Sequence, residues 1–206
     1  MHVEILLYDG FDELDAVGPY EVFETAGAFG ADCGARLVTL EPSESVTASH
    51  GLRVGVDGTF DAGGAVDGGD SPPVLLVPGG GWSDPSRPGA GMEAERGAVP
   101  DAVAEHAERG GVVAGVCTGG MLLAHAGVLD GRPAVTHASA LDDLRAMDVA
   151  VQDARFVDDG DVLTAGGVTS GLDLALHLVE RECGRDVAER VAGEIEYDRE
   201  TRPVEN

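Results

Sequence analysis

Short runs rich in valine, leucine and isoleucine alternate with longer helix-like segments along this 206-residue chain. Such alternation is typical of a mostly parallel sheet covered by helices, because neighbouring parallel strands must be joined by long crossover connections. The length allows one sizeable hydrophobic core and does not require a second. The sequence therefore predicts an α/β fold with a mostly parallel sheet, formed as a single domain over residues 1–206.

The expected elements follow from apolar runs, turn residues and helix caps. Strands are expected at residues 3–8, 35–40, 52–56, 74–77, 111–116, 134–136, 155–157 and 162–164. Helices are expected from the N-cap Asp12 to Gly27 and at residues 99–109, 121–126, 172–182 and 186–197. Leu14, Val17, Val22 and Phe23 are expected to form the apolar face of the first helix. A hairpin turn is expected at 158–160, a long loop at 83–97, and a Gly/Asp-rich loop between 56 and 74.

The charge of the chain excludes some partners. Its formal net charge is -25, from 38 acidic and 13 basic residues, and all the basic residues are arginine. Such a surface repels phosphate backbones and anionic lipids, since affinity for nucleic acids comes largely from cationic contacts. We therefore expect no nucleic-acid partner, no membrane partner and a small-molecule substrate.

The cysteines indicate a reducing compartment. Cys33, Cys117 and Cys183 are an odd number, widely spaced, with no signal peptide before them, so reduced thiols in the cytoplasm are expected. No CxxC pair or His/Cys cluster has the spacing of metal ligands, and no apolar run is long enough to span a membrane. We expect no metal and no cofactor, and we expect Cys33 and Cys183 to be inert.

Cys117 stands between a predicted buried strand and a predicted helix, in the sequence GVCTG at 115–119. Small neighbours allow a tight elbow that exposes its central side chain. The positive end of the helix dipole would stabilise a thiolate there and lower the pKa of the thiol. The alternative interpretation is a small buried hydrophobic residue, which is the usual role of a free cysteine.

A glycine triplet, Gly79, Gly80 and Gly81, directly follows the predicted strand at 74–77. Without side chains, its backbone N–H groups could approach a ligand and stabilise a developing negative charge, as in an oxyanion hole. A simple tight turn would explain the triplet equally well. The elbow at Cys117 favours the functional interpretation.

Five segments in family order resemble the isocyanide hydratase branch of the ThiJ/PfpI superfamily of class I glutamine amidotransferase-like proteins. They are LDAVGP at 14–19, PGGG at 78–81, VCTG at 116–119, TH at 136–137 and AGGVTSGLD at 165–173. The resemblance implies a flavodoxin-like three-layer α/β/α sandwich, a homodimer, and an acidic residue of the first helix beside the cysteine. Asp15 matches that acidic position, although a solvated first-turn carboxylate is the alternative.

The resemblance also bears on the neighbours of the cysteine. A carboxyl group touching the thiol could accept its proton or hydrogen-bond to its thiolate, depending on which pKa is higher. Thr118 stands where protease-like members carry histidine, so peptidase activity is not expected. His137 could line the pocket or carry a proton, and Ala138 stands where the hydratases carry an aromatic residue, which changes the expected pocket. Residues 166–173 should lie close to the elbow or simply cap a helix.

Three functions are compatible with these residues. The preferred one is a cofactor-free hydratase or hydrolase in which Cys117 attacks an electrophilic carbon and Asp15 moves the proton. Backbone donors of Gly80 and Thr118 would stabilise the charge, and the resemblance implies an isocyanide substrate. A glyoxalase or deglycase acting on aldehydes is the second, although aspartate at position 15 does not favour it. The third is a ligand-binding or redox-sensing module related to the amino-terminal halves of AraC-type regulators.

The acidic residues are spread through every segment, which predicts a protein adapted to high salt. Repulsion among like charges destabilises the compact state, and molar salt shortens the screening length to about 3 Å. The melting temperature should therefore be higher in molar potassium chloride than in dilute buffer. Equal melting temperatures in the two solutions would contradict this expectation.

Overall fold

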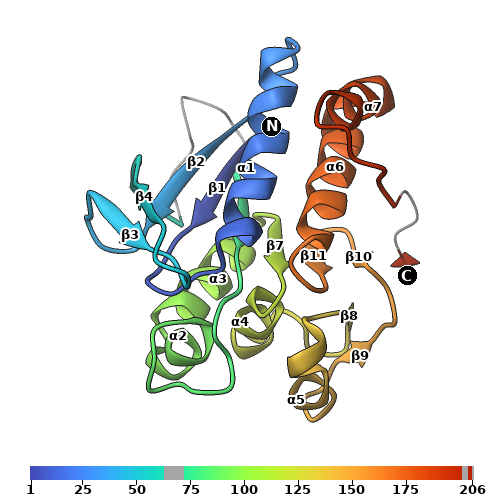
Figure 1. The fold of residues 1–206 in the computed structure, drawn as a ribbon. Helices are drawn as coiled ribbons and strands as arrows, with labels where there is room; N and C mark the ends of the chain where they lie inside the picture. The colour runs from blue at the N-terminus through green and yellow to red at the C-terminus, as the bar shows by residue number, and fades with distance from the viewer. Residues whose placement is uncertain (63–71, 201–203, 206) are drawn as a thin grey trace.

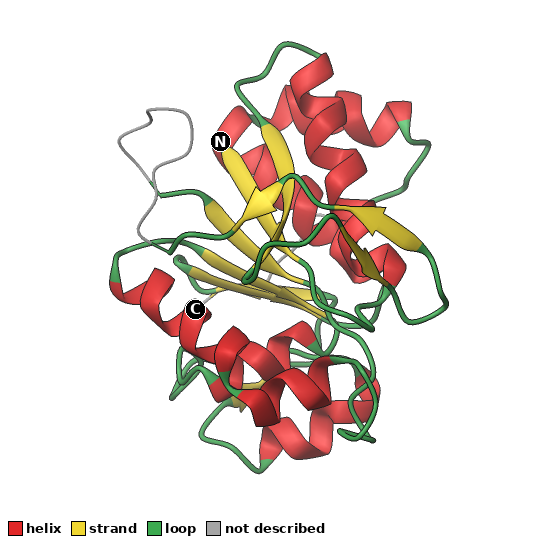
Figure 2. Cartoon of the chain, turned by 90° about the vertical axis from the view of Figure 1, so that its left-hand side faces the viewer, coloured by secondary structure: helices red, strands yellow, loops and turns green. Residues whose placement is uncertain are grey.

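The computed structural model describes residues 1–62, 72–200 and 204–205, and it contains a central sheet between two layers of helices (Figures 1 and 2). The eight-stranded sheet has the order β12-β10-β11-β7-β6-β1-β2-β5, and only the β10–β11 pair is antiparallel. Its strands are β1 His2–Leu6, β2 Gly34–Thr39, β5 Gly58–Thr59, β6 Val74–Val77, β7 Val113–Val116, β10 Phe156–Asp158, β11 Val162–Ala165 and β12 Val204–Glu205. This is the expected flavodoxin-like α/β fold.

The helices form two groups, one on each face of the sheet (Figure 2). One face carries three helices that contact one another, namely α1 Glu13–Ala28, α6 Ser170–Cys183 and α7 Arg185–Glu194. The other carries α2 Ala90–Arg96, α3 Ala98–Glu108 and α4 Gly119–His125. A short helix α5, Leu141–Arg145, follows a 3-10 turn at Ala138–Ala140. Within the described residues, no helix is long and apolar enough to cross a membrane.

Two short pairs of strands lie outside the main sheet. An antiparallel hairpin, β3 Ser45–Thr47 and β4 Arg53–Gly55, follows β2, and β8 Pro133–Ala134 pairs with β9 Ala150–Val151. The sequence predicted the second strand of the hairpin and missed the first, because Ser45–Thr47 is too short and too polar to stand out. The strand expected at 134–136 is shifted toward the N-terminus. Most of the expected Gly/Asp-rich loop lies outside the described residues.

The main elements fall where apolar runs and caps predicted them. Asp12 caps α1 by accepting a hydrogen bond from the Leu14 N–H, and the hairpin turn at 158–160 joins the antiparallel strands β10 and β11. Gly184 separates α6 from α7 as expected. These agreements follow from local signals, namely side-chain caps, tight turns and buried strands, that act through nearest neighbours in the chain.

The expectation of a continuous loop at 83–97 was wrong, because residues 90–96 form α2. The glycines in this segment disfavour a helix by local propensity, but here they allow α2 to pack closely against the neighbouring backbone. A Cβ atom on Gly91 would lie 2.4 Å from the Trp82 carbonyl oxygen, and Gly97 ends the helix in the left-handed conformation with φ 80°. Tertiary packing, which a local pattern does not contain, therefore determines this helix.

The expected apolar face of α1 was also partly wrong. Val22 and Phe23 are fully buried, whereas Leu14 is 39% and Val17 is 40% exposed. The helix turns Asp15 and Gly18 inward instead, and Gly18 lies against the Leu172 side chain of α6. A carboxyl group thus occupies a position that hydrophobic patterning would give to an aliphatic residue, and such burial of a charge-bearing group is typical of functional sites.

A buried carboxylate anchors the C-terminal segment to α6. Asp173 is 1% exposed, and it accepts hydrogen bonds from Arg155 Nε at 2.6 Å, Tyr197 Oη at 3.1 Å and the Glu200 N–H at 2.7 Å. The Arg155 side chain is 43% exposed. The buried Asp173 carboxylate therefore connects the segment after α7, through Tyr197 and Glu200, to Arg155 directly before β10.

Arg155→Ala should leave this buried carboxylate without its cation. Breaking a fully buried ion pair costs about 3–5 kcal/mol, and the partial exposure of Arg155 reduces the expected loss to about 2 kcal/mol. Denaturant unfolding would measure it. Arg145→Ala is the matched control, because its partner Asp142 is 97% exposed. Equal losses in the two variants would contradict the assigned role of Arg155.

Candidate functional site

The site lies at the carboxyl ends of β1, β6 and β7, where parallel strands bring their following loops together (Figure 1). This is the edge at which open α/β sheets bind ligands. Cys117 follows β7 directly and adopts the left-handed conformation with φ 57°, which costs a non-glycine residue about 1–2 kcal/mol. Its N–H donates to the Ala165 carbonyl at 3.0 Å, and its carbonyl accepts from Thr136 Oγ1 at 2.8 Å. Contacts with the end of β11 and with Thr136 thus hold the strained elbow.

Glycines beside the cysteine make this elbow possible. A Cβ atom on Gly119 would lie 2.1 Å from the Val77 carbonyl oxygen, and one on Gly115 would lie 2.9 Å from the Gly120 nitrogen. Neither position can accept a side chain without moving backbone atoms. Close backbone packing around Cys117 therefore requires glycine at positions 115 and 119.

Asp15 is fully buried in the first turn of α1. Its Oδ2 accepts a hydrogen bond from the Gly79 N–H at 2.9 Å. Its Oδ1 makes no hydrogen bond of regular geometry within the described chain, although the Cys117 thiol is close enough to lower the pKa of the carboxyl. Burial and the nearby Asp12 carboxylate raise that pKa, and together with the opposing Gly79 and Cys117 contacts they set it at about 7.

Cys117 is 6% exposed, and the pKa of its thiol is raised to about 12. Burial is the main cause and the charge of Asp15 adds to it, whereas the backbone amides of Thr118 and Val168 act in the opposite direction. The expectation of a lowered pKa was therefore wrong: α4 is short, and desolvation outweighs its dipole. When Asp15 is ionised, the proton of this pair stays on sulfur.

Two amides of the glycine triplet, expected as oxyanion donors, hydrogen-bond to side chains of the site instead. The Gly79 N–H donates to Asp15, and the Gly80 N–H donates to Thr118 Oγ1 at 2.9 Å. Thr118 Oγ1 in turn donates to the Gly80 carbonyl at 2.7 Å. The Gly79 and Gly80 amides are thus already engaged, so the expected oxyanion donors act here as supports for the two polar side chains. Gly81 lines the cleft itself.

A cleft of about 270 Å³ opens above the thiol. Its lining residues are Asp12, Ser49, Gly80, Gly81, Trp82, Cys117, Thr118, His137, Ser139 and Val168. His137 is half-buried, and its Nδ1 accepts a hydrogen bond from the Ser139 N–H at 3.1 Å, so a neutral ring carries its proton on Nε2. The structure thus brings all the predicted site residues together, with His137 on the wall of the cleft and capping the 3-10 turn.

Five lining residues were not predicted as site residues, namely Asp12, Ser49, Trp82, Ser139 and Val168. Val168 belongs to the segment expected near the elbow, but nothing in the sequence indicated that its amide faces the sulfur. Ser49 comes from the unpredicted hairpin, and Trp82 follows the glycine triplet. The position of Trp82 directly after Gly79, Gly80 and Gly81 was the one available signal.

Asp12, Glu13 and His50 each bring a potential metal-ligand atom to within 4.8 Å of one another beside the cleft. Glu13 is already occupied, because it pairs with His50 Nδ1 at 2.7 Å and accepts from Ser49 Oγ at 3.0 Å. Although burial acts to raise it, these hydrogen bonds lower the pKa of Glu13 to about 2. The group therefore ties the hairpin to the start of α1.

Together these features define a flavodoxin-like α/β protein with a cysteine elbow and a buried acidic partner. The model of the DJ-1/PfpI family matches residues 1–181, and the chain belongs to that family. It is 33% identical over 199 residues to isonitrile hydratase of Pseudomonas putida, covering 96% of this chain and 78% of that protein.

Two further comparisons describe the breadth of the family. The crystal structure of Drosophila melanogaster DJ-1beta superposes with a TM-score of 0.79 at 22% identity, over 96% of this chain and 98% of that one. The transcriptional regulator CdhR of Pseudomonas aeruginosa is 31% identical over 192 residues, which are 91% of this chain and 52% of the regulator. The family thus contains an enzyme and a regulator with similar domains.

The raised pKa of Asp15 predicts how stability depends on pH. Its carboxyl has a pKa of about 7 in the folded protein and an ordinary value of 3.8. The folded state therefore binds the proton more tightly, and the stability contributed by the protonated form is lost as the pH rises from about 4 to about 7. Asparagine cannot ionise, so Asp15→Asn should gain stability relative to wild type across this window.

Denaturant unfolding of both proteins at a series of pH values measures that difference. Glu13→Gln is the control for sign, because a carboxyl with a lowered pKa stabilises the protein at neutral pH and its removal should cost stability there. A difference between Asp15→Asn and wild type that is constant with pH would contradict the raised pKa of Asp15.

Proposed function

We propose that this protein is a cofactor-independent, cysteine-dependent hydratase or hydrolase of a small electrophilic molecule, similar to isonitrile hydratase. The observation that carries the proposal is the fully buried Asp15 carboxyl beside the strained Cys117 thiol at the base of an open cleft. A buried acid in contact with a nucleophile is costly for stability, and such pairs are typical of catalytic sites. The identity with isonitrile hydratase over nearly the whole chain supports the same chemistry.

The order of the two pKa values supports a general-base role for Asp15. Because the thiol has the higher pKa, the ionised carboxyl is the acceptor and the thiol is the donor of their shared proton. Asp15 then acts as a general base toward Cys117 during attack. A pKa of about 7 also lets it return the proton near neutral pH.

With an isocyanide, the terminal carbon accepts the sulfur electron pair while the thiol proton passes to Asp15. Asp15 then protonates that carbon, which gives a thioimidate bonded to Cys117. Water adds across the carbon–nitrogen double bond, the carbon–sulfur bond breaks, and the sulfur recovers a proton. The sum is one isocyanide plus one water giving one N-substituted formamide, with the enzyme restored.

Two backbone amides are placed to assist this cycle. The N–H groups of Thr118 and Val168 face the sulfur and lower the pKa of the thiol, so they stabilise the thiolate as its proton leaves. Thr118 Oγ1 is fixed by both its donated and its accepted bond to Gly80. We propose these amides in place of the Gly80 donor as the stabilisers of negative charge.

A ligand-binding module without turnover is the second candidate, and the similarity to CdhR over 91% of this chain favours it. In that case the cleft would bind a small molecule and Cys117 would be a wall residue or an oxidation site. Measurable cysteine-dependent turnover separates the two candidates, because a binding module gives none.

We further propose a homodimer in the cytoplasm. The exposed side chains of Leu14 and Val17 on α1 supply apolar surface that a second copy could cover. Cys33, Cys117 and Cys183 are all free thiols, as suits a reducing compartment.

An activity panel of isocyanides, methylglyoxal, amides and peptides tests the enzymatic proposal. Isocyanides should be hydrated to formamides, Cys117→Ala should abolish turnover, and Asp15→Asn should lower kcat by about 100-fold or more, as expected for loss of a general base. Cys183→Ala is the matched control and should retain activity. Turnover that survives in Cys117→Ala, or its absence in wild type with every compound, would overturn the proposal.

A further inference from the structure

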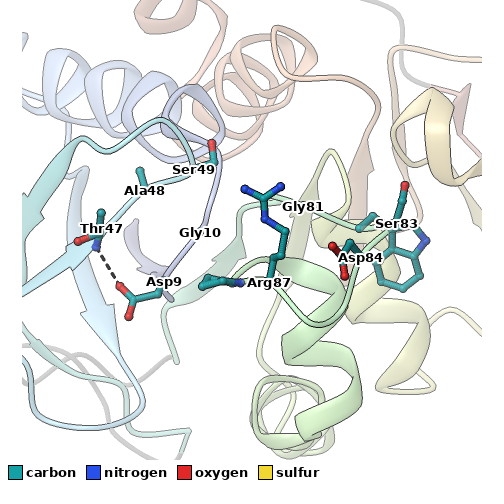
Figure 3. Close-up of a pocket in the computed structure, with 11 residues that line it drawn as sticks. Asp9, Gly10, Thr47, Ala48, Ser49, Gly81, Ser83, Asp84 and Arg87 are labelled. Atoms are coloured by element: carbon teal, nitrogen blue, oxygen red, sulfur yellow. Dashed lines mark hydrogen bonds between the residues drawn. The ribbon is translucent and has the colours of Figure 1, made fainter.

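A second, larger pocket adjoins the cleft above Cys117. It has a volume of about 620 Å³ and lies between the β3–β4 hairpin and the loop that precedes α2 (Figure 3). Ser49, Gly81 and Trp82 line both cavities, so the two lie side by side along these residues. A molecule larger than the cleft could therefore place its reactive end at the thiol and the rest of its structure in this pocket.

The boundary between the two cavities is held in place. Trp82 Nε1 donates a hydrogen bond to Asp143 Oδ2 at 2.6 Å, and the indole contacts the His125 ring edge-on at a centroid distance of 5.8 Å. Glu13 fixes the opposite side through its bond from Ser49 Oγ. The path from the pocket to Cys117 is thus formed by supported side chains.

Arg87 extends its guanidinium into the middle of this pocket (Figure 3). Among the residues that the structure describes, its side chain makes no ion pair or hydrogen bond. In contrast, nine other arginines are in ion pairs: Arg36, Arg96, Arg109, Arg132, Arg145, Arg155, Arg181, Arg185 and Arg199. Arg53 bonds to Ser45 Oγ and Arg190 lies over the Phe29 ring, so among the described arginines Arg87 alone has no side-chain partner.

Two carboxylates also line the pocket, and both are directed toward other groups. Asp9 Oδ1 accepts from the Thr47 N–H at 3.0 Å, and Asp84 Oδ1 accepts from Ser86 Oγ at 2.6 Å. Neither forms an ion pair with Arg87, although Asp84 is near enough to feel its charge. The guanidinium therefore keeps its donors available for a ligand.

We propose that Arg87 binds a carboxylate on the substrate, so that the substrate is a small electrophile with a carboxylate arm extending away from its reactive carbon. This inference rests on the proposed function. A guanidinium donates two parallel hydrogen bonds to a carboxylate, which fixes the orientation of the ligand as well as its charge. The acidic surface elsewhere repels anions, and Arg87 supplies a local attraction inside the pocket.

Paired substrates test the assignment. Isocyanoacetate and its longer homologues carry the carboxylate at increasing distance from the reactive carbon, and their methyl esters are matched neutral compounds. Wild type should prefer the acid over the ester of one homologue by about tenfold or more in kcat/KM, as expected for a charge-assisted hydrogen bond. Arg87→Gln should remove that preference by lowering kcat/KM for the acid to about the value for its ester.

Arg53→Gln is the control for net charge, because Arg53 lies on the hairpin, bonds to Ser45 Oγ and does not line the pocket. It should keep the preference for the acid. Hydration of acid and ester at equal efficiency, or the same acid-to-ester ratio in Arg87→Gln and wild type, would overturn the role of Arg87 while leaving the proposed function intact.

A binding measurement separates failure of this inference from failure of the proposed function. If no isocyanide is hydrated, the proposed function falls, and calorimetry with N-formylglycine, its longer homologues and their methyl esters then decides the role of Arg87. Tighter binding of an acid than of its ester, lost in Arg87→Gln and kept in Arg53→Gln, supports the inference. Equal binding of acid and ester, or binding of neither, overturns it.

Discussion

The proton shared between the buried carboxyl of Asp15 and the buried thiol of Cys117 is the interaction on which the rest of the site depends. Desolvation raises both pKa values, and the higher value of the thiol keeps the proton on sulfur when the carboxyl is ionised. Such a pair is unfavourable for folding, because neither group can ionise without losing its hydration. The surrounding hydrogen bonds from Gly79, Thr118 and Val168 limit that cost.

The architecture explains how the chain tolerates this arrangement. Three parallel strands end at one edge of the sheet, and each delivers a different component: the loop after β1 leads to Asp15, the loop after β6 supplies the glycine triplet, and β7 ends at Cys117. The loops pack so closely at Gly79 and Gly119 that a Cβ atom at either position would collide with backbone atoms of the neighbouring loop or strand. The larger pocket is assembled from the hairpin and the loop before α2, outside this rigid centre, where changes of sequence would alter the shape of the pocket without disturbing the pair.

The sequence predicted the layers of the fold, and the structure brings together the residues that it singled out, such as Asp15, Cys117 and His137, because buried strands, helix caps and close glycines leave local signals. The contacts between segments were not predictable in the same way. Leu14 and Val17 followed helical spacing yet face outward, since the rotation of α1 is set by the inward placement of Asp15 and Gly18. Helix α2 was missed because its glycines serve tertiary packing, and the pKa of Cys117 was expected to fall because burial depth cannot be read from the elbow motif. Arg87 carried no signal at all, since its lack of a partner is a property of the folded surface.

Direct titration of the two buried groups tests the central claim. Carbon-13 NMR of labelled aspartate should show the Asp15 carboxyl ionising at about pH 7, and the ultraviolet difference between wild type and Cys117→Ala should show no thiolate at that pH. A thiolate signal already present at neutral pH, with Asp15 protonated beside it, would reverse the order of the two pKa values and contradict the account.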